Sequence, residues 1–310
     1  MEPVTAGDPQ SEQKWVRVSL RHLEAQLAPT EHAVSTPTIR RLLQQNDYSL
    51  RVNAKEKEPG GQPPFRNEQF EYIETQVARF RADGQPIISA DTKKKELIGD
   101  FKQAGRAWVQ EPTQVNAHDF PTHAVGRAVP YGIYDVQRNT GAVYVGQSSD
   151  TPEFAVAAIT RWWQERGRVQ YPAATELLIL VDAGGSNGCR PHLWKAQLQE
   201  QLCNALGLTV TVCHYPTGCS KWNPIEHRLF SAISQNWAGE PLRTFDTMLG
   251  YIAGTTTKTG LQVTASLLTG VFKTGRRVAK AVMQALNLEV HTVCPKWNYT
   301  IRPQAQAAPA

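Results

Sequence analysis

Three carboxylates in this chain stand at positions where side chains commonly perform chemistry. Asp91 and Asp182 each follow a short apolar run, and Asp182 also precedes a glycine-rich turn. Such runs are typical of buried strands, and the carboxyl ends of strands are where open α/β sheets keep their ligand sites. Glu226 falls in the first turn of a helix that Asn223 should cap and Pro224 should open.

These three acids form one cluster if their two strands lie parallel and side by side. Both aspartates then emerge at the same edge of the sheet, and a returning helix can bring Glu226 beside them. Clustered carboxylates repel one another, whereas divalent cations such as Mg²⁺ prefer oxygen ligands. Two such ions about 4 Å apart activate an attacking hydroxyl and stabilise the leaving oxygen of a phosphodiester.

Each acid also has a purely structural interpretation. Asp182 could hydrogen-bond within its own turn, and Asp91 could be an ordinary residue at the end of a strand. Glu226 is the third residue after Asn223, so the pair could form a capping box. A coincidence of all three at these topological places is less expected than any one of them.

The order of elements predicts an α/β fold. Alternating apolar patterns and turn residues indicate β-β-β-α-β-α-β-α, with a helix that Thr151 caps and Pro152 opens after the third strand. We expect an RNase H-like five-stranded mixed sheet flanked by helices. Its strands should lie at residues 86–90, 131–136, 142–146, 177–181 and 208–213.

A small helical module should precede the sheet. Residues up to about Trp15 are typical of a disordered leader, and two short helices follow, one capped by Ser19 and one capped by Thr36 with Pro37 at its first position. Two short helices with one apolar face each suggest a helix-turn-helix. Its second helix would then present polar side chains to the major groove: Thr38, Arg40, Arg41, Gln44 and Gln45. A helical hairpin with a solvated polar face is the alternative.

Composition divides the rest of the chain. Residues 51–66 are charged and rich in Pro and Gly, as in a linker, and a helix with Phe70, Ile73, Val77 and Phe80 on one face should follow Asn67. The domains expected are a partial helix-turn-helix module at 1–50, a linker and connecting helix at 51–84, an RNase H-like domain at 85–245, and a basic C-terminal extension at 246–310.

Charge indicates a polyanionic partner. The chain has 310 residues and a net charge of +5, and after Gly250 seven basic residues stand against a single acid, Glu289. Two basic groups are candidates for phosphate contacts, although solvated surfaces would explain them as well. They are the run Lys93, Lys94 and Lys95, and the set Lys273, Arg276, Arg277 and Lys280, which would spread around one helix.

Other features exclude some classes of protein. The chain has no apolar run long enough to span a membrane, and its polar start lacks the apolar region of a signal peptide. Its five scattered cysteines contain no C-x-x-C pair. We therefore expect reduced thiols in a cytosolic protein rather than a disulfide framework or a zinc site.

Longer sequence words point to a family. The chain resembles bacterial insertion-sequence transposases of the ISAzo type, also called the Rhodopirellula transposase family, from about Glu2 to Pro303. The matching words are ISADTKKKELIGDF, HDF, VPYGIYD, TPEFAVAAITRWW, LLILVDAGGSNG and, most specifically, HYPTGCSKWNPIEHRLFS. Its asparagine-proline-x-acid element is also similar to that of the wider mariner-like transposases.

The resemblance implies an RNase H-like DDE domain whose catalytic, metal-binding acids are Asp91, Asp182 and Glu226. It implies Mg²⁺, or Mn²⁺ in its place, with nicking at transposon ends and then attack by the freed 3′-hydroxyl on target DNA. The partners would be double-stranded DNA and further copies of the chain assembled on it, in the bacterial cytoplasm at the nucleoid.

Similar proteins carry more sequence before the point that matches Glu2, so we expect the chain to begin inside the DNA-binding region. Two other functions stay open. The chain could be a catalytically idle, shortened DNA-binding remnant that acts as a repressor. It could also be a host nuclease of the same fold, which the sequence words disfavour.

Overall fold

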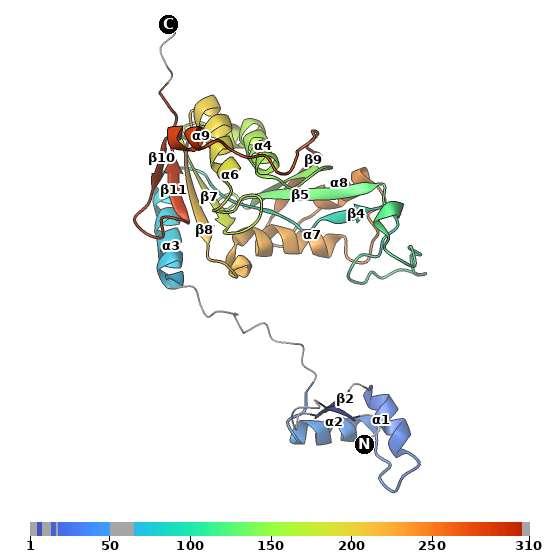
Figure 1. Cartoon of the computed structure of the whole chain (residues 1–310). Helices are drawn as coiled ribbons and strands as arrows, with labels where there is room; N and C mark the ends of the chain where they lie inside the picture. Colours follow the sequence, from blue (N-terminus) through green and yellow to red (C-terminus); the bar gives the residue numbers. More distant parts are fainter. Residues whose placement is uncertain (1–4, 8–13, 17, 50–64, 306–310) are drawn as a thin grey trace. The chain divides into compact units, whose positions relative to one another are not determined.

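The computed structural model describes residues 5–7, 14–16, 18–49 and 65–305. The chain forms two compact units, Met1–Pro59 and Gly60–Ala310 (Figure 1). The linker expected at 51–66 lies outside the described residues except at its last two positions. Among the described residues, no helix combines the length and the apolar composition that a membrane crossing requires.

The smaller unit contains two short strands and two helices. Strand β1 (Thr5–Gly7) pairs antiparallel with β2 (Lys14–Val16). The expectation of a disordered leader is therefore wrong for these residues. Helices α1 (Leu20–Leu27) and α2 (Thr36–Gln45) follow, as the apolar spacing predicts.

The start of the first helix matches the sequence, and the start of the second differs by one residue. The Ser19 hydroxyl accepts a hydrogen bond from the His22 N–H at the start of α1. At α2 the N-cap position belongs to Ser35, and Thr36 is the first helical residue. The Thr36 hydroxyl is instead used between the helices, since it donates to the Glu24 carboxylate.

The larger unit is built on one mixed sheet. Its strands are β3 (Ile87–Thr92), β4 (Glu96–Ile98), β5 (Gly126–Asp135), β6 (Thr140–Gly146), β7 (Glu176–Asp182), β8 (Thr209–Tyr215), β9 (Gln262–Leu267), β10 (Leu288–Val290) and β11 (Asn298–Ile301). Its α-helices are α3 (Arg66–Ala82), α4 (Pro152–Trp162), α5 (Arg168–Gln170), α6 (His192–Gln197), α7 (Ser231–Asn236), α8 (Phe245–Ala253) and α9 (Lys280–Ala285). Shorter turns are the 3-10 helices η2 (Pro121–His123) and η5 (Ser220–Trp222) and the π-helices η3 (Trp163–Gly167), η4 (Leu198–Asn204) and η6 (Glu226–Phe230).

The five expected strands form the centre of the sheet, in the order β8-β7-β3-β5-β6. Strands β7 and β8 run parallel to β3, whereas β5 is antiparallel to it and forms a hairpin with β6. This is the RNase H-like arrangement, so the predicted fold is confirmed. The sheet is larger than the five strands expected, since it has nine strands within the described residues.

The additional strands come mainly from the C-terminal part of the chain. Strand β9 lies parallel beside β6 at one edge of the sheet, and β11 followed by β10 extends the sheet beyond β8 at the other. Residues 246–310, suggested by their charge to be a basic extension, therefore supply strands at both edges of the sheet (Figure 1).

Alternation along the central strands divides the core into two layers. Ile88 and Ala90 of β3 pack in the layer that contains α4 and α6, whereas Ile87 packs with α3 on the opposite face. Because side chains alternate along a strand, Ser89 and Asp91 share the face of Ile87. Asp182 shares that face too, since Leu178 and Leu180 before it pack beside Ile87.

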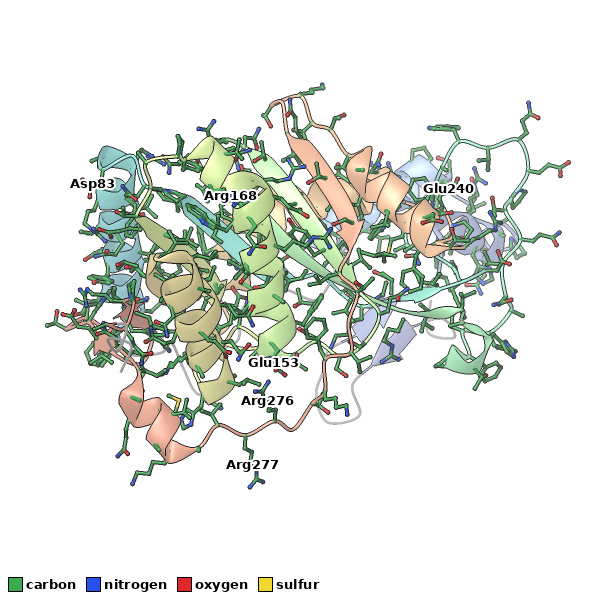
Figure 2. The ribbon with its side chains drawn as sticks, turned by 90° about the horizontal axis from the view of Figure 1, so that it is seen from above. Asp83, Glu153, Arg168, Glu240, Arg276 and Arg277 are labelled. Carbon is green, nitrogen blue, oxygen red and sulfur yellow. The ribbon has the colours of Figure 1, made fainter. Side chains whose placement is uncertain are left out.

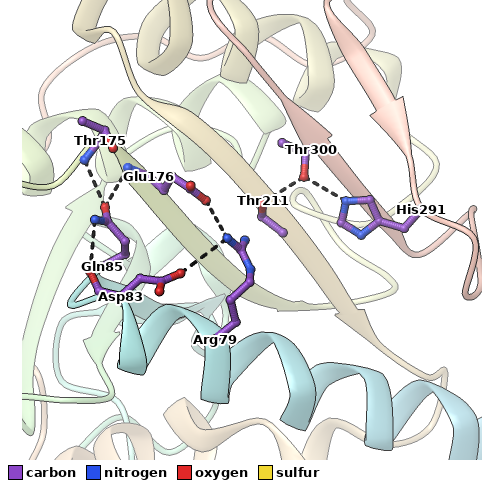
Figure 3. A network of polar contacts seen from close by, with 8 residues as sticks. All are labelled: Arg79, Asp83, Gln85, Thr175, Glu176, Thr211, His291 and Thr300. Carbon is purple, nitrogen blue, oxygen red and sulfur yellow. Dashed lines mark hydrogen bonds and ion pairs between the residues drawn. The ribbon is translucent and has the colours of Figure 1, made fainter.

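Polar contacts join α3 to sheet strands far away in the sequence. Buried Gln69 and buried Asn298 exchange two amide hydrogen bonds, of 2.8 and 2.6 Å. Near the other end of α3, Arg79 Nη1 lies 3.2 Å from Glu176 Oε2 at the start of β7. Gln85 Oε1 accepts from the Glu176 N–H in the same region (Figure 3).

The same side of the sheet contains a chain of hydroxyl and imidazole groups. The Thr211 and Thr300 hydroxyls lie 2.9 Å apart on neighbouring strands, and His291 Nε2 lies 2.8 Å from Thr300 Oγ1 (Figure 3). The hydroxyl of Tyr72 on α3 lies 2.7 Å from His291 Nδ1. Helix α3 is thus bonded both to β7 and to the C-terminal strands.

Candidate active site

The three predicted acids lie on three neighbouring elements at one edge of the sheet. Asp91 is the penultimate residue of β3, Asp182 is the last residue of β7, and Glu226 is the first residue of η6. Strands β3 and β7 pair in parallel, with Ser89 opposite Leu180, so their carboxyl ends meet at the same edge. The two aspartates also share the face of the sheet on which the helix of Glu226 packs.

Electrostatic coupling shows that the three carboxylates lie near one another. Burial and then the charge of Asp182 raise the pKa of Asp91 to about 8, and Glu226 adds to this rise. Burial raises the pKa of Asp182, whereas its hydrogen bond from Asn223 lowers that pKa. Burial and the charge of Asp182 likewise raise the pKa of Glu226.

Three clustered carboxylates repel one another in water, and bound divalent cations relieve that repulsion. Carboxylate oxygens are the ligands that Mg²⁺ prefers, and one or two carboxylates for each ion are usual. In the part of the chain that the structure describes, no three His, Cys, Asp or Glu side chains are close enough to hold one metal ion. The donor set suits ions that are each held by one or two of these carboxylates.

The structure changes the role of Asn223. Its side chain was expected to cap the following helix, but Nδ2 donates to Asp182 Oδ1 at 3.0 Å, and Oδ1 accepts from the Ser89 hydroxyl. The Ile225 N–H at the start of the helix donates to Ser89 Oγ at 3.1 Å. Asn223 supports the site directly, and a serine from β3 occupies the capping position.

A backbone hydrogen bond in the same region argues against a capping box as the role of Glu226. A capping box would require the Glu226 side chain to accept from the backbone N–H of Asn223. That N–H donates to the Ser220 carbonyl at 2.9 Å. For Asp91 the structural interpretation has some support, since its Oδ1 accepts from the Thr92 N–H at 2.7 Å.

The lysine run after Asp91 divides into three different environments. Lys93 was expected to be exposed near DNA, but it is only 9% exposed, lies 3.9 Å from Glu96 Oε1, and stacks on the Trp237 ring. Paired lysines can be buried, so this correction follows an ordinary rule. Lys94 and Lys95 are exposed, and Lys95 Nζ lies 3.5 Å from Asp150 Oδ2.

The C-terminal bases do not share a helix. Lys273, Arg276 and Arg277 lie in an irregular segment, and Lys280 is the first residue of α9. This segment and the loop after Asp182 line a groove of about 680 Å³, together with the start of α4. Figure 2 shows Arg276 directed toward Glu153, with which it forms an ion pair, and Arg277 directed away from it.

In the smaller unit, the residues predicted to contact DNA are accessible. Arg40, Arg41 and Gln44 are exposed on α2, whereas Ile39 on the same helix is buried. Arg40 and Gln44 are four residues apart, so they lie on the same face of the helix. Leu42, expected on the apolar face, is 43% exposed.

Two residues beside the acids were missed by the sequence interpretation. Ser89 could have been found, because it precedes Asp91 by two residues and therefore shares its face. Asp150 adds to the raised pKa of Asp91 and accepts from the Thr92 hydroxyl at 3.1 Å. Its position after β6 gave no signal in the sequence. Asp150 reaches the site because β6 pairs with β5, and β5 in turn pairs with β3, the strand of Asp91.

Comparison with known families decides the identity of the chain. The family described as Rhodopirellula transposase DDE domain matches residues 1–303. The chain belongs to this family. The transposase is thus a metal-dependent polynucleotidyl transferase, as the resemblance in its sequence words predicts.

Solved structures with a similar fold are distant. The Mos1 transposase paired-end complex with left transposon end is 13% identical, with a TM-score of 0.43 over 79% of this chain and 73% of that chain. The mariner Mos1 paired end complex with Mg is 11% identical, with a TM-score of 0.46 over 80% and 74%. No curated protein matches the transposase. The family match, and not these distant similarities, establishes the family.

Proposed function

We propose that the transposase cleaves the ends of its insertion sequence and joins the freed 3′-hydroxyl to target DNA, with Asp91, Asp182 and Glu226 as metal ligands. The observation that carries this proposal is the position of three acids at one edge of the sheet, where β3 and β7 pair in parallel, and the raised pKa of Asp91 supports it. Perturbed acids that cluster in this way are typical of catalytic sites.

In this proposal the acids hold two Mg²⁺ or Mn²⁺ ions, which supply activation of the attacking oxygen and stabilisation of the leaving oxygen. Asp91 and Asp182 come from rigid neighbouring strands, so their relative position is set before substrate arrives. Glu226 comes from a helix packed on the same face of the sheet and supplies the third carboxylate. Partial burial of all three limits competing water.

The proposed substrate is double-stranded DNA. The titles of the similar Mos1 structures name a paired-end complex with a transposon end, a strand transfer complex, and complexes with Mn and Mg. By analogy we propose transposon ends and target DNA as partners, assembly of several copies on DNA, and a location at the bacterial nucleoid. The basic groove beside the Asp182 loop is our candidate path for the DNA backbone.

The deciding experiment combines purified transposase with DNA that carries the ends of its own element, with and without Mg²⁺. Mg²⁺-dependent nicking and strand joining at those ends support the proposal. End binding without cleavage would favour the idle repressor instead. Mg²⁺-dependent cleavage without preference for the ends would favour a host nuclease.

Sequence recognition should depend on helix α2. We expect Arg40→Ala with Gln44→Ala to weaken binding to transposon ends by at least about tenfold, since each base contact contributes about 1–3 kcal/mol. Binding to random DNA should fall much less. Gel-shift titrations on both DNAs measure the difference, and an equal loss on both would show that α2 does not recognise sequence.

Nonspecific affinity should depend on the basic groove. Each phosphate contact releases a counterion, so Arg276→Ala with Arg277→Ala should flatten the log–log dependence of affinity on salt by up to about two units. Sequence preference should stay unchanged. Arg168→Ala is a matched control, because Arg168 is exposed at the opposite end of the helical segment that begins near Glu153 (Figure 2). An unchanged slope in the double variant would exclude these contacts.

A further inference from the structure

A buried polar network joins the three elements that carry the acids. Ser89 lies on β3, two residues before Asp91, and Asn223 lies three residues before Glu226. The side chains of Ser89 and Asn223 are both fully buried. Through them, the strand of Asp91 and the helix of Glu226 are connected to Asp182 itself.

Each hydrogen bond in this network fixes the orientation of the next group. The Ser89 hydroxyl donates to Asn223 Oδ1, so the amide must present its NH₂ group on the other side. That group donates to Asp182 Oδ1 at 3.0 Å. The lone pairs of Ser89 Oγ remain available, and one accepts from the Ile225 N–H at 3.1 Å.

These bonds restrain the acids in two ways. The Asn223 amide holds the Asp182 carboxylate against rotation about its terminal bond. The Ser89 hydroxyl holds the first turn of the helix, which contains Ile225 and Glu226, against strand β3. Mutation of groups that orient the ligands of a metal typically lowers metal affinity by about 10–100-fold.

We propose that Ser89 and Asn223 are positioning residues that preorganise Asp182 and Glu226 for divalent cations. This inference rests on the proposed function, because it takes the three acids to be the metal ligands. A purely structural role for the network would lower thermal stability and leave metal affinity unchanged. Metal affinity therefore separates the two roles.

The test is a direct titration of the full chain with Mn²⁺ in the absence of DNA. The electron paramagnetic resonance signal of free Mn²⁺ measures how much of the metal remains unbound. Ser89→Ala and Asn223→Ala should each weaken binding by about tenfold. Thr211→Val is the matched control, since Thr211 is a buried hydroxyl on β8 that bonds Thr300 instead of the acids. It should leave Mn²⁺ affinity within about twofold of wild type, whatever it does to the melting temperature.

The double variant tests the connection between the two residues. If Ser89 acts through Asn223, the losses are not additive, and Ser89→Ala with Asn223→Ala binds Mn²⁺ about as weakly as Asn223→Ala alone. Additive losses would support separate action of Ser89 through Ile225 and of Asn223 through Asp182. Unchanged affinity in Ser89→Ala would overturn the inference. If Ser89→Ala does not fold, unchanged affinity in Asn223→Ala overturns the inference equally.

The acids themselves distinguish failure of this inference from failure of the proposed function. Asp182→Ala should lose most of the Mn²⁺ binding. If it binds like wild type, the acids are not metal ligands and the proposed function fails. If Asp182→Ala loses binding while Ser89→Ala and Asn223→Ala keep it, only the positioning inference fails.

Discussion

Asp182→Ala should lose Mg²⁺-dependent strand cleavage by at least about 10³-fold, because metal ions stabilise a phosphodiester transition state by several kcal/mol. Asp91→Ala and Glu226→Ala should behave in the same way. Binding to transposon ends in the absence of metal should stay within about twofold, since recognition is assigned to a different unit of the chain. Single-turnover cleavage and gel-shift titration measure the two properties separately.

Two further variants sharpen this prediction. Glu226→Gln retains the shape of the side chain and loses its charge, so it should fail like alanine, and normal cleavage would make Glu226 a structural residue. Asp83→Ala is the matched control. Asp83 is an exposed aspartate at the end of α3, just before the start of β3 and therefore at the opposite end of that strand from Asp91. Retained Mg²⁺-dependent cleavage in Asp182→Ala would contradict the proposed mechanism.

Asp91→Asn should stabilise the metal-free protein near pH 8. An unfolded aspartate loses its proton near pH 4, whereas folded Asp91 keeps its proton up to a pKa of about 8. The folded state therefore binds one additional proton between these values, and the corresponding stability is lost as the pH rises from about 4 to about 8. Asparagine avoids this loss, which we place on the order of 3 kcal/mol or more.

Thermal unfolding in chelator measures this effect. The melting temperature of Asp91→Asn should exceed that of wild type by on the order of 5 °C or more near pH 8, and the gap should shrink toward pH 5. Added Mg²⁺ should stabilise wild type and leave Asp91→Asn unchanged. The exposed variant Asp83→Asn should change stability by less than about 0.5 kcal/mol. A less stable Asp91→Asn at pH 8 would show that Asp91 is not held in an unfavourable charged state.

The central sheet could be predicted because its signals are local. The apolar runs before Asp91 and Asp182 alternate between two packed layers, and the turn at residues 136–139 joins the neighbouring strands in a hairpin. The outer strands could not be predicted in this way. Strand β11 is four residues long, and its partner β8 ends more than 80 residues before it, so no periodicity connects them.

The three acids of the candidate site could be predicted from the sequence, whereas the contacts of the residues around them could not. The acids follow from strand ends and helix starts, which the sequence indicates directly. Lys93 is buried because it lies against Trp237, and Asn223 bonds Asp182, a residue 41 positions earlier. Contacts of this kind depend on the packed fold and leave no pattern in the neighbouring residues. The segment around Arg276 is likewise irregular and not helical, and Arg276 forms an ion pair with Glu153.

The hydrogen bonds between α3 and the C-terminal strands have a consequence for synthesis of the chain. Gln69 and Asn298 are 229 positions apart, so Gln69 leaves the ribosome long before its partner exists. Until then the Gln69 amide lacks its Asn298 partner, and strand β8 presents an open edge on which other chains can add. Folding of the larger unit must therefore finish after translation is nearly complete. A chain that stops before β11 would expose this edge permanently, which makes early termination a route to aggregation and not to a smaller working enzyme.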